Sequence, residues 1–321
     1  MQRSADTAWT LTDGRAGNVR QAEALAAALG LEATAHVLRA RAPWRWWAPR
    51  RVAGEAHAFG AGFMRERGTP PRWAIGCGRH AALATRLLRG PGTLAVQVLD
   101  PRIDPRHWDA VVVPAHDRVR GANVVTLLGS LHPVDDAWLA HGRAAFATFS
   151  ALARPRVALL VGAPSAHWRS DDAALLRAIG HVAAAVREAG GSVLATASRR
   201  TPDAVREALP DALHAVPHVA WRDLRDGANP YGGLLGWADA IACTPDSVNM
   251  LSEACATHAP VFALDADATQ GRVGAFVATL RARGRVATGG DAWLAAARAG
   301  AQWFPLRETA RVAAELHARL G

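Results

Sequence analysis

The first half of the chain alternates short, nearly continuous apolar runs with longer stretches in which apolar residues recur every three or four positions. Such runs are typical of strands in a parallel sheet that is covered on both faces, and the longer stretches are typical of the covering helices. The predicted strands span residues 8–13, 33–40, 72–78, 93–100, 109–116 and 123–130. The predicted helices span residues 19–30, 79–90 and 133–153.

The same alternation restarts after Arg154-Pro155. Strands are predicted at residues 156–164, 192–198, 214–221 and 259–265, with one more inside 230–247. Helices are predicted at residues 171–191, 201–213, 247–258 and 308–321, the second of them broken near Pro210. This pattern predicts an α/β fold with doubly wound parallel sheets.

The length of the chain predicts two domains, because 321 residues exceed what one hydrophobic core usually fills. The restart near residue 154 marks the expected boundary. We therefore predict two facing Rossmann-like lobes, residues 1–153 and 154–321, with the last helix able to pack back on the first lobe.

The types of basic residue in the chain exclude several kinds of enzyme chemistry. The formal net charge is +9, and all 37 basic residues are arginine. Without lysine, the chain cannot form the lysine–phosphate contact of a P-loop or a Schiff base with pyridoxal phosphate. Short-chain-type sugar epimerases use a Tyr–Lys pair, and the only tyrosine, Tyr231, has no lysine to partner it. Phosphate ligands and anionic lipid remain compatible with such a basic surface.

The cysteines and histidines indicate no metal site. Cys77, Cys243 and Cys255 each lie in an apolar run, so we expect buried free thiols, and we predict no metal. No apolar run approaches the roughly 18 residues of a membrane-spanning helix, and the N-terminus lacks a secretory apolar region. No nucleic-acid motif is present. We expect a cytoplasmic protein that does not bind nucleic acid.

Open parallel sheets bind ligands where their strands end, and several polar segments of the second half lie at such ends. Gly162 and Ser165 follow the first strand in a small-residue turn whose N–H groups can approach a phosphate. Ser198, Arg199, Arg200 and Thr201 follow the second strand, and guanidinium groups donate to phosphate in a fork. An ordinary turn and a solvated arginine pair are the open alternatives.

Two further segments add candidates for a sugar or a nucleobase. Asn229 and Tyr231 stand at a predicted helix start, where they either cover a ligand or only begin the helix. Asp246 or Ser247 caps the next helix, whose first turn, with Met250, offers N–H groups to a diphosphate. Glu253 lies about 9 Å further along the same face, where a carboxylate can accept both ribose hydroxyls. A capped helix with a surface glutamate remains the alternative.

The first half carries a glycine-bearing loop after its first strand. We interpret it as an acceptor or phosphate loop, with Arg79 at the end of another strand reaching an anionic substrate. The loop and the helix after it contribute Asp13, Gly14, Arg15, Gly17, Asn18 and Gln21. Ordinary turn chemistry explains each of these residues equally well.

Residues 42–51 contain three tryptophans, three arginines and two prolines. Indoles favour the headgroup level of a membrane, and arginines favour anionic lipid. A peripheral membrane contact is one interpretation, and an aromatic loop folded onto its own lobe is the other. The residues concerned are Trp44, Trp46, Trp47, Arg50 and Arg51.

Several motifs together resemble the elongated-mitochondria fission family and its bacterial homologues, in the same order along residues 9 to 265. Bacterial members have been labelled nucleoside-diphosphate-sugar epimerases, and the plant member is associated with organelle fission. The matching motifs are TLTDGRAGNVRQAEALA, IGCGRHAA, LDPR, VVVPAHD, NVVTLLGSLH, ASRRTP, NPYGG and TPDSVNMLSEACATHAPVF.

The second half also resembles the two-lobed, glycosyltransferase-B-like enzymes that make lipid II and lipid A disaccharide. By that resemblance Glu253 holds the ribose, and Ser165, Ser247 and nearby N–H groups hold the diphosphate. Those enzymes often carry a histidine where this chain has Asn18, so the resemblance leaves Asp13 as the substitute catalytic base.

These observations support three functional hypotheses. The first is a metal-independent glycosyltransferase that binds a nucleoside-diphosphate sugar in the second lobe and transfers the sugar to an acceptor. The acceptor would be a membrane-linked cell-envelope glycan, such as a lipopolysaccharide core precursor, at the inner face of the membrane. The second is a non-catalytic binding or scaffold protein on the same fold. The third is a nucleotide-sugar 2-epimerase that uses His116 and Asp117.

Overall fold

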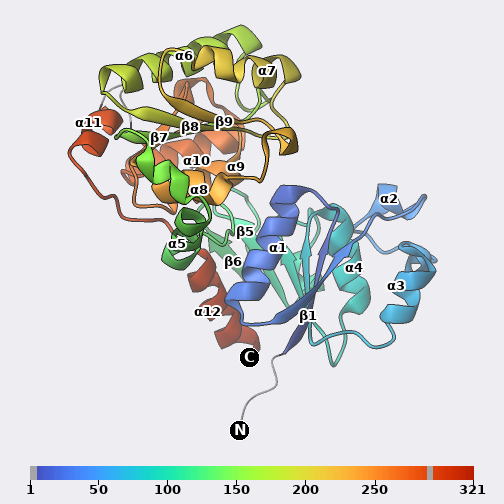
Figure 1. The fold of residues 1–321 in the computed structure, drawn as a ribbon. Coiled ribbons are helices and arrows are strands. Elements are labelled where there is room, and N and C mark those ends of the chain that lie inside the picture. Colours follow the sequence, from blue (N-terminus) through green and yellow to red (C-terminus); the bar gives the residue numbers. More distant parts are fainter. Residues whose placement is uncertain (1–5, 288–291) are drawn as a thin grey trace. The chain divides into compact units, whose positions relative to one another are not determined.

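The computed structural model describes residues 6–287 and 292–321, which fall into two compact units. Unit 1 consists of the chain up to Pro133 together with Glu308–Gly321. Unit 2 consists of Val134–Arg307. Figure 1 labels the helices and strands of both units.

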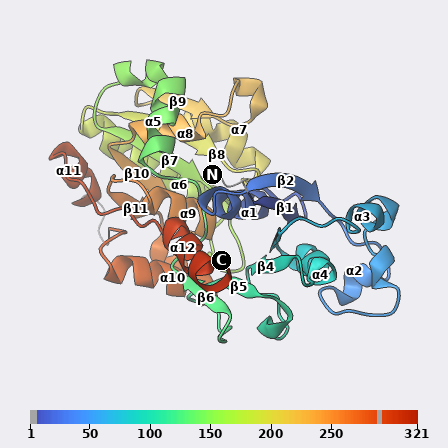
Figure 2. The ribbon, with the colours of Figure 1, turned by 90° about the horizontal axis from the view of Figure 1, so that it is seen from below.

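Unit 1 is built on a six-stranded parallel sheet in the order β2-β1-β3-β4-β5-β6. Apolar residues of α1 and α12 cover one face of the sheet, and those of α3 and α4 cover the other. The strands are β1 (Thr7–Thr12), β2 (Glu32–Val37), β3 (Trp73–Cys77), β4 (Leu94–Val98), β5 (Ala110–Pro114) and β6 (Val124–Leu127). The helices are α1 (Ala16–Ala28), α2 (Trp44–Trp47), α3 (Gly60–Glu66), α4 (Arg79–Leu88) and α12 (Thr309–Leu320) (Figure 2).

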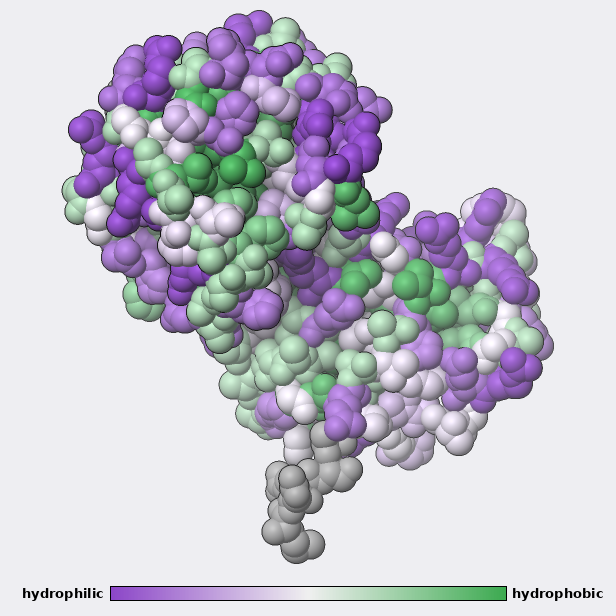
Figure 3. Space-filling view, in the orientation of Figure 1, coloured by the Kyte–Doolittle hydropathy of each residue, from purple (hydrophilic) through white to green (hydrophobic). Residues whose placement is uncertain are grey.

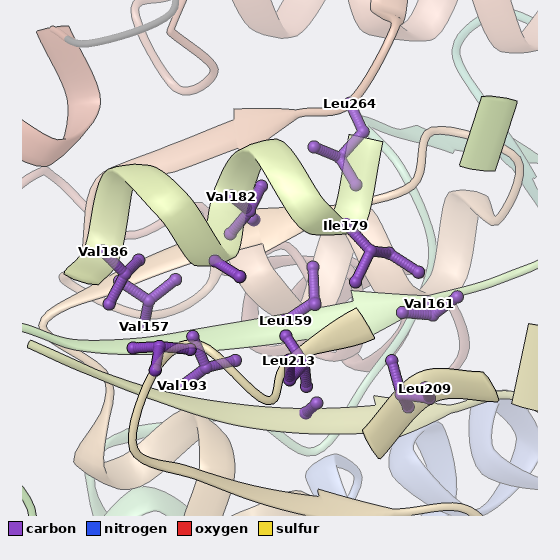
Figure 4. Close-up of a cluster of buried hydrophobic side chains, with 14 of the residues drawn as sticks. Val157, Leu159, Val161, Ile179, Val182, Val186, Val193, Leu209, Leu213 and Leu264 are labelled. Carbon is purple, nitrogen blue, oxygen red and sulfur yellow. The ribbon is translucent and has the colours of Figure 1, made fainter. Parts of the chain in front are cut away.

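Unit 2 is built on a five-stranded parallel sheet in the order β11-β10-β7-β8-β9. Figure 4 shows Val157, Leu159 and Val161 of β7 packed under Ile179 and Val182 of α6. The strands are β7 (Arg156–Val161), β8 (Ser192–Ala197), β9 (His218–Trp221), β10 (Ala240–Cys243) and β11 (Val261–Ala263). The helices are α5 (Asp136–Ala145), α6 (Asp172–Glu188), α7 (Asp203–Ala212), α8 (Tyr231–Trp237), α9 (Val248–Cys255), α10 (Gly271–Ala282) and α11 (Ala292–Arg298).

The division between the units falls before α5, about twenty residues earlier than the boundary predicted after residue 153. The reason is close packing between α5 and α8 inside unit 2. A Cβ atom on Gly142 of α5 would lie 2.3 Å from the carbonyl oxygen of Gly232 in α8, so the two backbones touch. The last helix does return to unit 1, where Thr309 Oγ1 donates to the carbonyl of His132 at 2.9 Å.

Two predicted helices differ from the observed ones. The stretch 133–153 is not one helix, because Phe146 leaves the helical backbone (φ −124°) and a 3₁₀ turn, Ala147–Ala151, comes after α5. The helix α7 is not broken near Pro210 but continues to Ala212. Proline removes one N–H donor, and so close to the C-terminal end of a helix that loss is tolerated.

The three cysteines are buried free thiols, as predicted from their apolar surroundings. Burial raises the pKa of Cys255 to about 12, so this thiol stays protonated at neutral pH. Within residues 6–287 and 292–321, no helix combines the length and apolar character needed to cross a membrane.

Candidate functional site

The strand order of unit 2 places a topological switch point between β7 and β10. From β7 the chain builds outward through β8 and β9, then crosses back to place β10 on the other side of β7. Loops that leave adjacent strands in opposite directions open a crevice at the carboxyl ends of those strands, where α/β proteins bind ligands. The loops after Val161 and Cys243 therefore meet at the candidate site.

A buried network of hydrogen bonds joins these two loops. Gly162 N donates to Thr244 Oγ1 at 2.7 Å, and Thr244 Oγ1 lies 2.8 Å from Asp246 Oδ1. The Asp246 side chain is fully buried. Burial raises the pKa of Asp246, while the Thr244 hydroxyl and the Arg200 charge act in the opposite direction. The carboxylate therefore organises the loops rather than facing a ligand.

Arg200 is the exposed member of this network and pairs with Asp246. Its Nη2 lies 2.7 Å from Asp246 Oδ2, while 58% of the side chain remains exposed. The turn that carries it is shaped by two hydroxyls, since Ser198 Oγ lies 3.1 Å from Thr201 Oγ1 and Thr201 Oγ1 donates to the carbonyl of Val161. Arg200 can thus offer its remaining N–H groups to an anion. The neighbouring Arg199 is exposed as well.

Replacing Arg200 with glutamine should destabilise the protein more at mildly alkaline pH than at acidic pH. Without the guanidinium, the pKa of the buried Asp246 carboxyl rises further above its unfolded value. A raised folded pKa means that the stabilising effect of protonation is lost as pH rises through that pKa, so the deficit against the wild type grows with pH. Urea unfolding of both proteins at the two pH values measures this deficit. A deficit independent of pH would contradict the ion pair.

Ser247 is the N-cap of α9, which decides between Asp246 and Ser247, the two residues that the sequence suggests. Its backbone is extended (φ −109°, ψ 105°), and its Oγ accepts from Met250 N at 3.3 Å. The last five residues of the helix, Leu251 to Cys255, are all buried, so its second half lies within the core. The cap satisfies one N–H of the first turn and leaves the helix dipole directed at the switch point.

The backbone N–H groups of the loop after β7, which the sequence suggests as phosphate donors, have acceptors within the protein. The Gly162 N–H is bonded to Thr244, and the Ala163 N–H is bonded to the Asp246 carboxylate. Pro164 has no N–H, and Ser165 N donates to the carbonyl of Trp168 at 3.0 Å. The hydroxyl of Ser165 accepts from His167 N at 3.2 Å. At this strand end, the exposed guanidinium groups of Arg199 and Arg200 and the first turn of α9 remain as candidate donors for an anion.

Glu253 and Tyr231, predicted separately as ligand contacts, are bonded to each other. The Tyr231 hydroxyl donates to Glu253 Oε2 at 2.6 Å, and only 3% of Glu253 is exposed. Asn229 Oδ1 accepts from Tyr231 N at 3.0 Å, which fixes the start of α8. A ribose that uses Glu253 must therefore share the carboxylate with the phenol or displace it.

Changing Tyr231 to phenylalanine should lower the free energy of unfolding by about 1–3 kcal/mol. The ring remains, but the buried carboxyl group of Glu253 loses a short hydrogen bond, and losing one hydrogen bond at a buried polar group costs about this much. Urea unfolding monitored by circular dichroism measures the change. An unchanged midpoint and slope would show that the carboxylate is satisfied without the phenol.

In unit 1, the ends of β1 and β3 bring a second polar group together. Asp13 Oδ1 accepts from Asn18 Nδ2 at 2.9 Å and from Arg15 N at 3.1 Å. A Cβ atom on Gly78 would lie 2.8 Å from Asn18 Nδ2, and the positive φ of this residue (96°) also favours glycine. Gly14 adopts a left-handed conformation (φ 80°) that allows the chain to turn between Asp13 and the start of α1.

Two of the unit 1 candidates, Gln21 and Arg79, make hydrogen bonds within the unit. Gln21 is buried, and its amide donates to the carbonyl of Gly17 at 3.3 Å inside α1. The Arg79 guanidinium donates to the carbonyls of Trp46 and Ala48, so it anchors the tryptophan-rich segment.

His80 is a titratable group near this edge that the sequence analysis missed. It lies in the first turn of α4, and burial, followed by the charge of Arg79, lowers its pKa. The charge of Asp13 acts on it in the opposite direction, which places the two side chains in one electrostatic neighbourhood. Its position in the sequence, directly after Arg79 where a predicted strand is followed by a helix, could have identified it as a candidate.

A family model described as mitochondrial fission ELM1 matches residues 16–320. The chain belongs to the mitochondrial fission ELM1 family. A curated ELM1 protein from Arabidopsis thaliana is 30% identical over 284 residues, which cover 78% of this chain and 64% of the plant protein. The chain thus spans less than two thirds of the length of this ELM1 relative. These matches confirm the resemblance carried by the sequence motifs.

Solved structures establish that this ELM1 family chain has a glycosyltransferase-B-like fold. MurG from Acinetobacter baumannii superposes with a TM-score of 0.51 at 14% identity, covering 98% of this chain and 99% of that one. The UDP-GlcNAc 2-epimerase from Methanocaldococcus jannaschii superposes with a TM-score of 0.56 at 11% identity, covering 97% and 99%. Identities this low speak for the fold alone, and they confirm the predicted α/β class.

A surface pocket of about 560 Å³ adjoins the switch point of this ELM1 family member. Ala163, Pro164 and Arg200 form one part of its lining, and residues 170–173 at the start of α6 form another. Two carboxylates, Asp171 and Asp172, belong to that second part and would repel a phosphate. An anion is therefore better accommodated on the α9 side of Arg200.

Proposed function

We propose that the chain is a glycosyltransferase-like protein in which unit 2 binds a nucleoside-diphosphate sugar and unit 1 binds the acceptor. One observation carries the proposal. An exposed arginine, Arg200, is held at the switch point whose other side begins α9, and Glu253 lies along that same helix. A cation and a helix N-terminus suit a diphosphate, and a carboxylate suits a ribose.

The donor would be anchored at two points. Its diphosphate would accept hydrogen bonds from the Arg200 guanidinium and from the N–H groups of the first turn of α9, next to Ser247. Its ribose would reach Glu253, about 9 Å along the helix, and would take over part of the bond now made by Tyr231. The name of the methanococcal relative, a UDP-GlcNAc 2-epimerase, supports a nucleotide-sugar ligand.

The transfer step would proceed by direct displacement. An acceptor hydroxyl oxygen attacks the anomeric carbon, the bond from that carbon to the diphosphate oxygen breaks, and a base takes the hydroxyl proton. We propose Asp13 as that base. His80 is the second candidate, because its lowered pKa keeps the imidazole neutral and able to accept a proton at neutral pH.

Replacing Asp13 with asparagine should lower kcat by about 10²–10⁴-fold if Asp13 is the base, while donor affinity stays unchanged. Asparagine keeps an oxygen that can accept from Asn18 but cannot take up a proton. Replacing His80 with glutamine is the matched comparison. A large loss for the His80 variant and a small one for the Asp13 variant would transfer the role to His80.

The acceptor would be a lipid-linked glycan of the cell envelope, and the protein would work in the cytoplasm at the inner face of a membrane. The tryptophan- and arginine-rich segment of unit 1 supports this part of the proposal. A glycan carried on a lipid stays at the membrane surface. A segment that contacts the membrane would bring unit 1 to the same surface.

Two other functions have an observation in their favour. A non-catalytic binding protein is favoured by Asn18, which stands where related transferases often carry histidine, and by the name of the plant relative. A 2-epimerase is favoured by the likeness to the methanococcal structure, with His116 and Asp117 after β5 as the proton-transfer groups.

Calorimetry and subsequent product analysis separate the three. We expect at least one of UDP, GDP and CMP to bind, and no binding to folded protein by any of them would refute a nucleotide site. Acceptor-dependent release of nucleoside diphosphate indicates transfer, and interconversion of a UDP-amino sugar without acceptor indicates epimerisation. Binding without either reaction indicates the non-catalytic function.

A further inference from the structure

We infer that the segment from residue 42 to residue 51, the tryptophan segment, is a preformed docking surface for an anionic lipid bilayer. The inference deepens the membrane part of the proposed function, but it does not depend on sugar transfer, because the observations behind it all belong to unit 1. The tryptophan segment carries the short helix α2 between Pro43 and Pro49.

The tryptophan segment exposes two adjacent indoles. Trp46 is 60% exposed and Trp47 is 55% exposed. Exposed large apolar residues are few in the part of the chain that the structure describes, and the others, Val37, Leu224 and Phe304, are not neighbours of one another in sequence. Two solvated indoles on consecutive residues are typical of a surface that is covered in its working state. Indoles favour the headgroup level of a membrane.

The tryptophan segment is held in place by α4. The Arg79 guanidinium donates to the carbonyls of Trp46 and Ala48, and Arg86 Nη1 donates to the carbonyl of Pro49 at 2.6 Å. Ala48 itself is buried in the core between α3 and α4. These bonds fix the backbone that presents the indoles, so docking orders little further chain and retains most of its binding free energy.

The inward-turned indole of Trp44 supports the tryptophan segment from inside. Its Nε1 donates to the carbonyl of Ala53 at 3.0 Å, and its ring lies against Gly54, where a Cβ atom would be 3.2 Å from the ring. Trp46 and Trp47, by contrast, face outward. The three tryptophans that the sequence analysis grouped together thus divide into one anchor and two contact residues.

The charge of the tryptophan segment selects an anionic partner. Residues 38–54 contain five arginines and no aspartate or glutamate. Arg45, Arg50 and Arg51 are exposed, and Arg51 alone of the three has a carboxylate partner, Glu55, at 2.8 Å within the described chain. In Figure 3 the upper right of unit 1, where Figure 1 labels α2, is largely hydrophilic, as expected from these arginines. Basic side chains beside interfacial indoles suit the phosphates of acidic lipids.

Lipid fits these observations better than single-stranded nucleic acid. Nucleic-acid sites stack bases on open aromatic faces. The Arg45 guanidinium carbon lies 5.0 Å from the centre of the Trp46 ring and covers one of its faces. An arginine stacked on an indole is compatible with insertion of the ring edge between headgroups.

The test is vesicle flotation with the full chain. The vesicles contain phosphatidylcholine either alone or with about a third phosphatidylglycerol, and their partition coefficients are compared. We expect binding to the anionic vesicles, weaker binding at high salt, and a loss of about tenfold or more in the Trp46→Ala/Trp47→Ala variant. The matched control, Leu224→Ala/Phe304→Ala, removes two exposed apolar side chains from unit 2 and should bind like the wild type.

A second variant separates lipid contact from support. Arg79→Gln removes the guanidinium that holds the carbonyls of Trp46 and Ala48 but leaves both exposed indoles in place. We expect this variant to bind the anionic vesicles more weakly than the wild type. Equal flotation by wild type and the Trp46/Trp47 variant, or no flotation of the wild type with anionic vesicles, would overturn the inference. Binding of a fluorescent oligonucleotide that the Trp46/Trp47 variant loses, without vesicle binding, would assign the surface to nucleic acid.

Discussion

Alanine at position 162 will lower the free energy of unfolding by about 3 kcal/mol and weaken the binding of nucleoside diphosphates. The new Cβ atom would lie 1.9 Å from Asp246 Oδ1 and 2.7 Å from its Oδ2. The carboxylate is buried and bonded to Thr244 and Arg200, so it cannot move away without breaking those bonds. Arg200 would then lose its fixed position at the switch point. Urea unfolding and calorimetry measure the two effects.

The control for this substitution is alanine at position 180, inside α6. A Cβ atom there meets no atom within 4 Å, so Gly180→Ala should be neutral or stabilise the helix by roughly 0.5–1 kcal/mol. A double variant sharpens the test, since Asp246→Ala removes the atoms with which the new methyl group collides. We expect Gly162→Ala to cost much less in that background than in the wild type. Equal costs in both backgrounds would show that the clash with Asp246 does not govern the loop.

Glutamine at position 253 will weaken the binding of UDP by about 10- to 100-fold. A carboxylate accepts two ribose hydroxyls more strongly than an amide does, and hydrogen bonds to charged groups contribute about 1.5–3 kcal/mol. The size of the side chain is kept, and the Tyr231 hydroxyl still finds an oxygen to bond. Calorimetry with UDP measures the loss, and Glu188→Gln, an exposed glutamate at the end of α6, is the matched control.

The ligand supplies the second half of this test. If Glu253 holds the ribose, a UDP analogue without the ribose hydroxyls should bind the wild type weakly and should bind the Glu253→Gln variant with little further loss. An equal loss for UDP and for the analogue would mean that Glu253 acts through the fold, by way of its bond to Tyr231. Unchanged UDP affinity in the variant would remove Glu253 from the site.

Much of the fold could be predicted from local patterns. Strands buried on both faces, such as β5 and β7, appear as unbroken apolar runs because every side chain meets a covering helix. The cap at Ser247 was also predictable, because a short hydroxyl before an apolar periodic stretch has few other uses. Both features depend on residues close together in the sequence.

The contacts that local patterns did not predict join residues far apart in the sequence. The N–H groups of the 162–165 loop were predicted to be donors, but Thr244 and Asp246, some eighty residues later, already accept from the first two. Arg79 is a similar case, since its carbonyl partners lie about thirty residues earlier. A glycine contact between α5 and α8 likewise decides the boundary of unit 2. No spacing rule along the chain encodes such pairings.

The bond between Tyr231 and Glu253 shows what the structure adds to two separate predictions. Sequence patterns favoured both residues as ligand contacts but gave no reason to pair them. Because the Tyr231 hydroxyl already donates to Glu253, a ribose can bind this carboxylate only by sharing it with the hydroxyl or displacing it. The two predictions can therefore be tested together.

The crystal structure of the chain with bound UDP tests the central claim most directly. We expect the diphosphate within hydrogen-bond distance of the Arg200 guanidinium and the first turn of α9, with the ribose hydroxyls on Glu253. UDP bound at the Asp13–Asn18 edge of unit 1, or bound to unit 2 with its ribose away from Glu253, would contradict it.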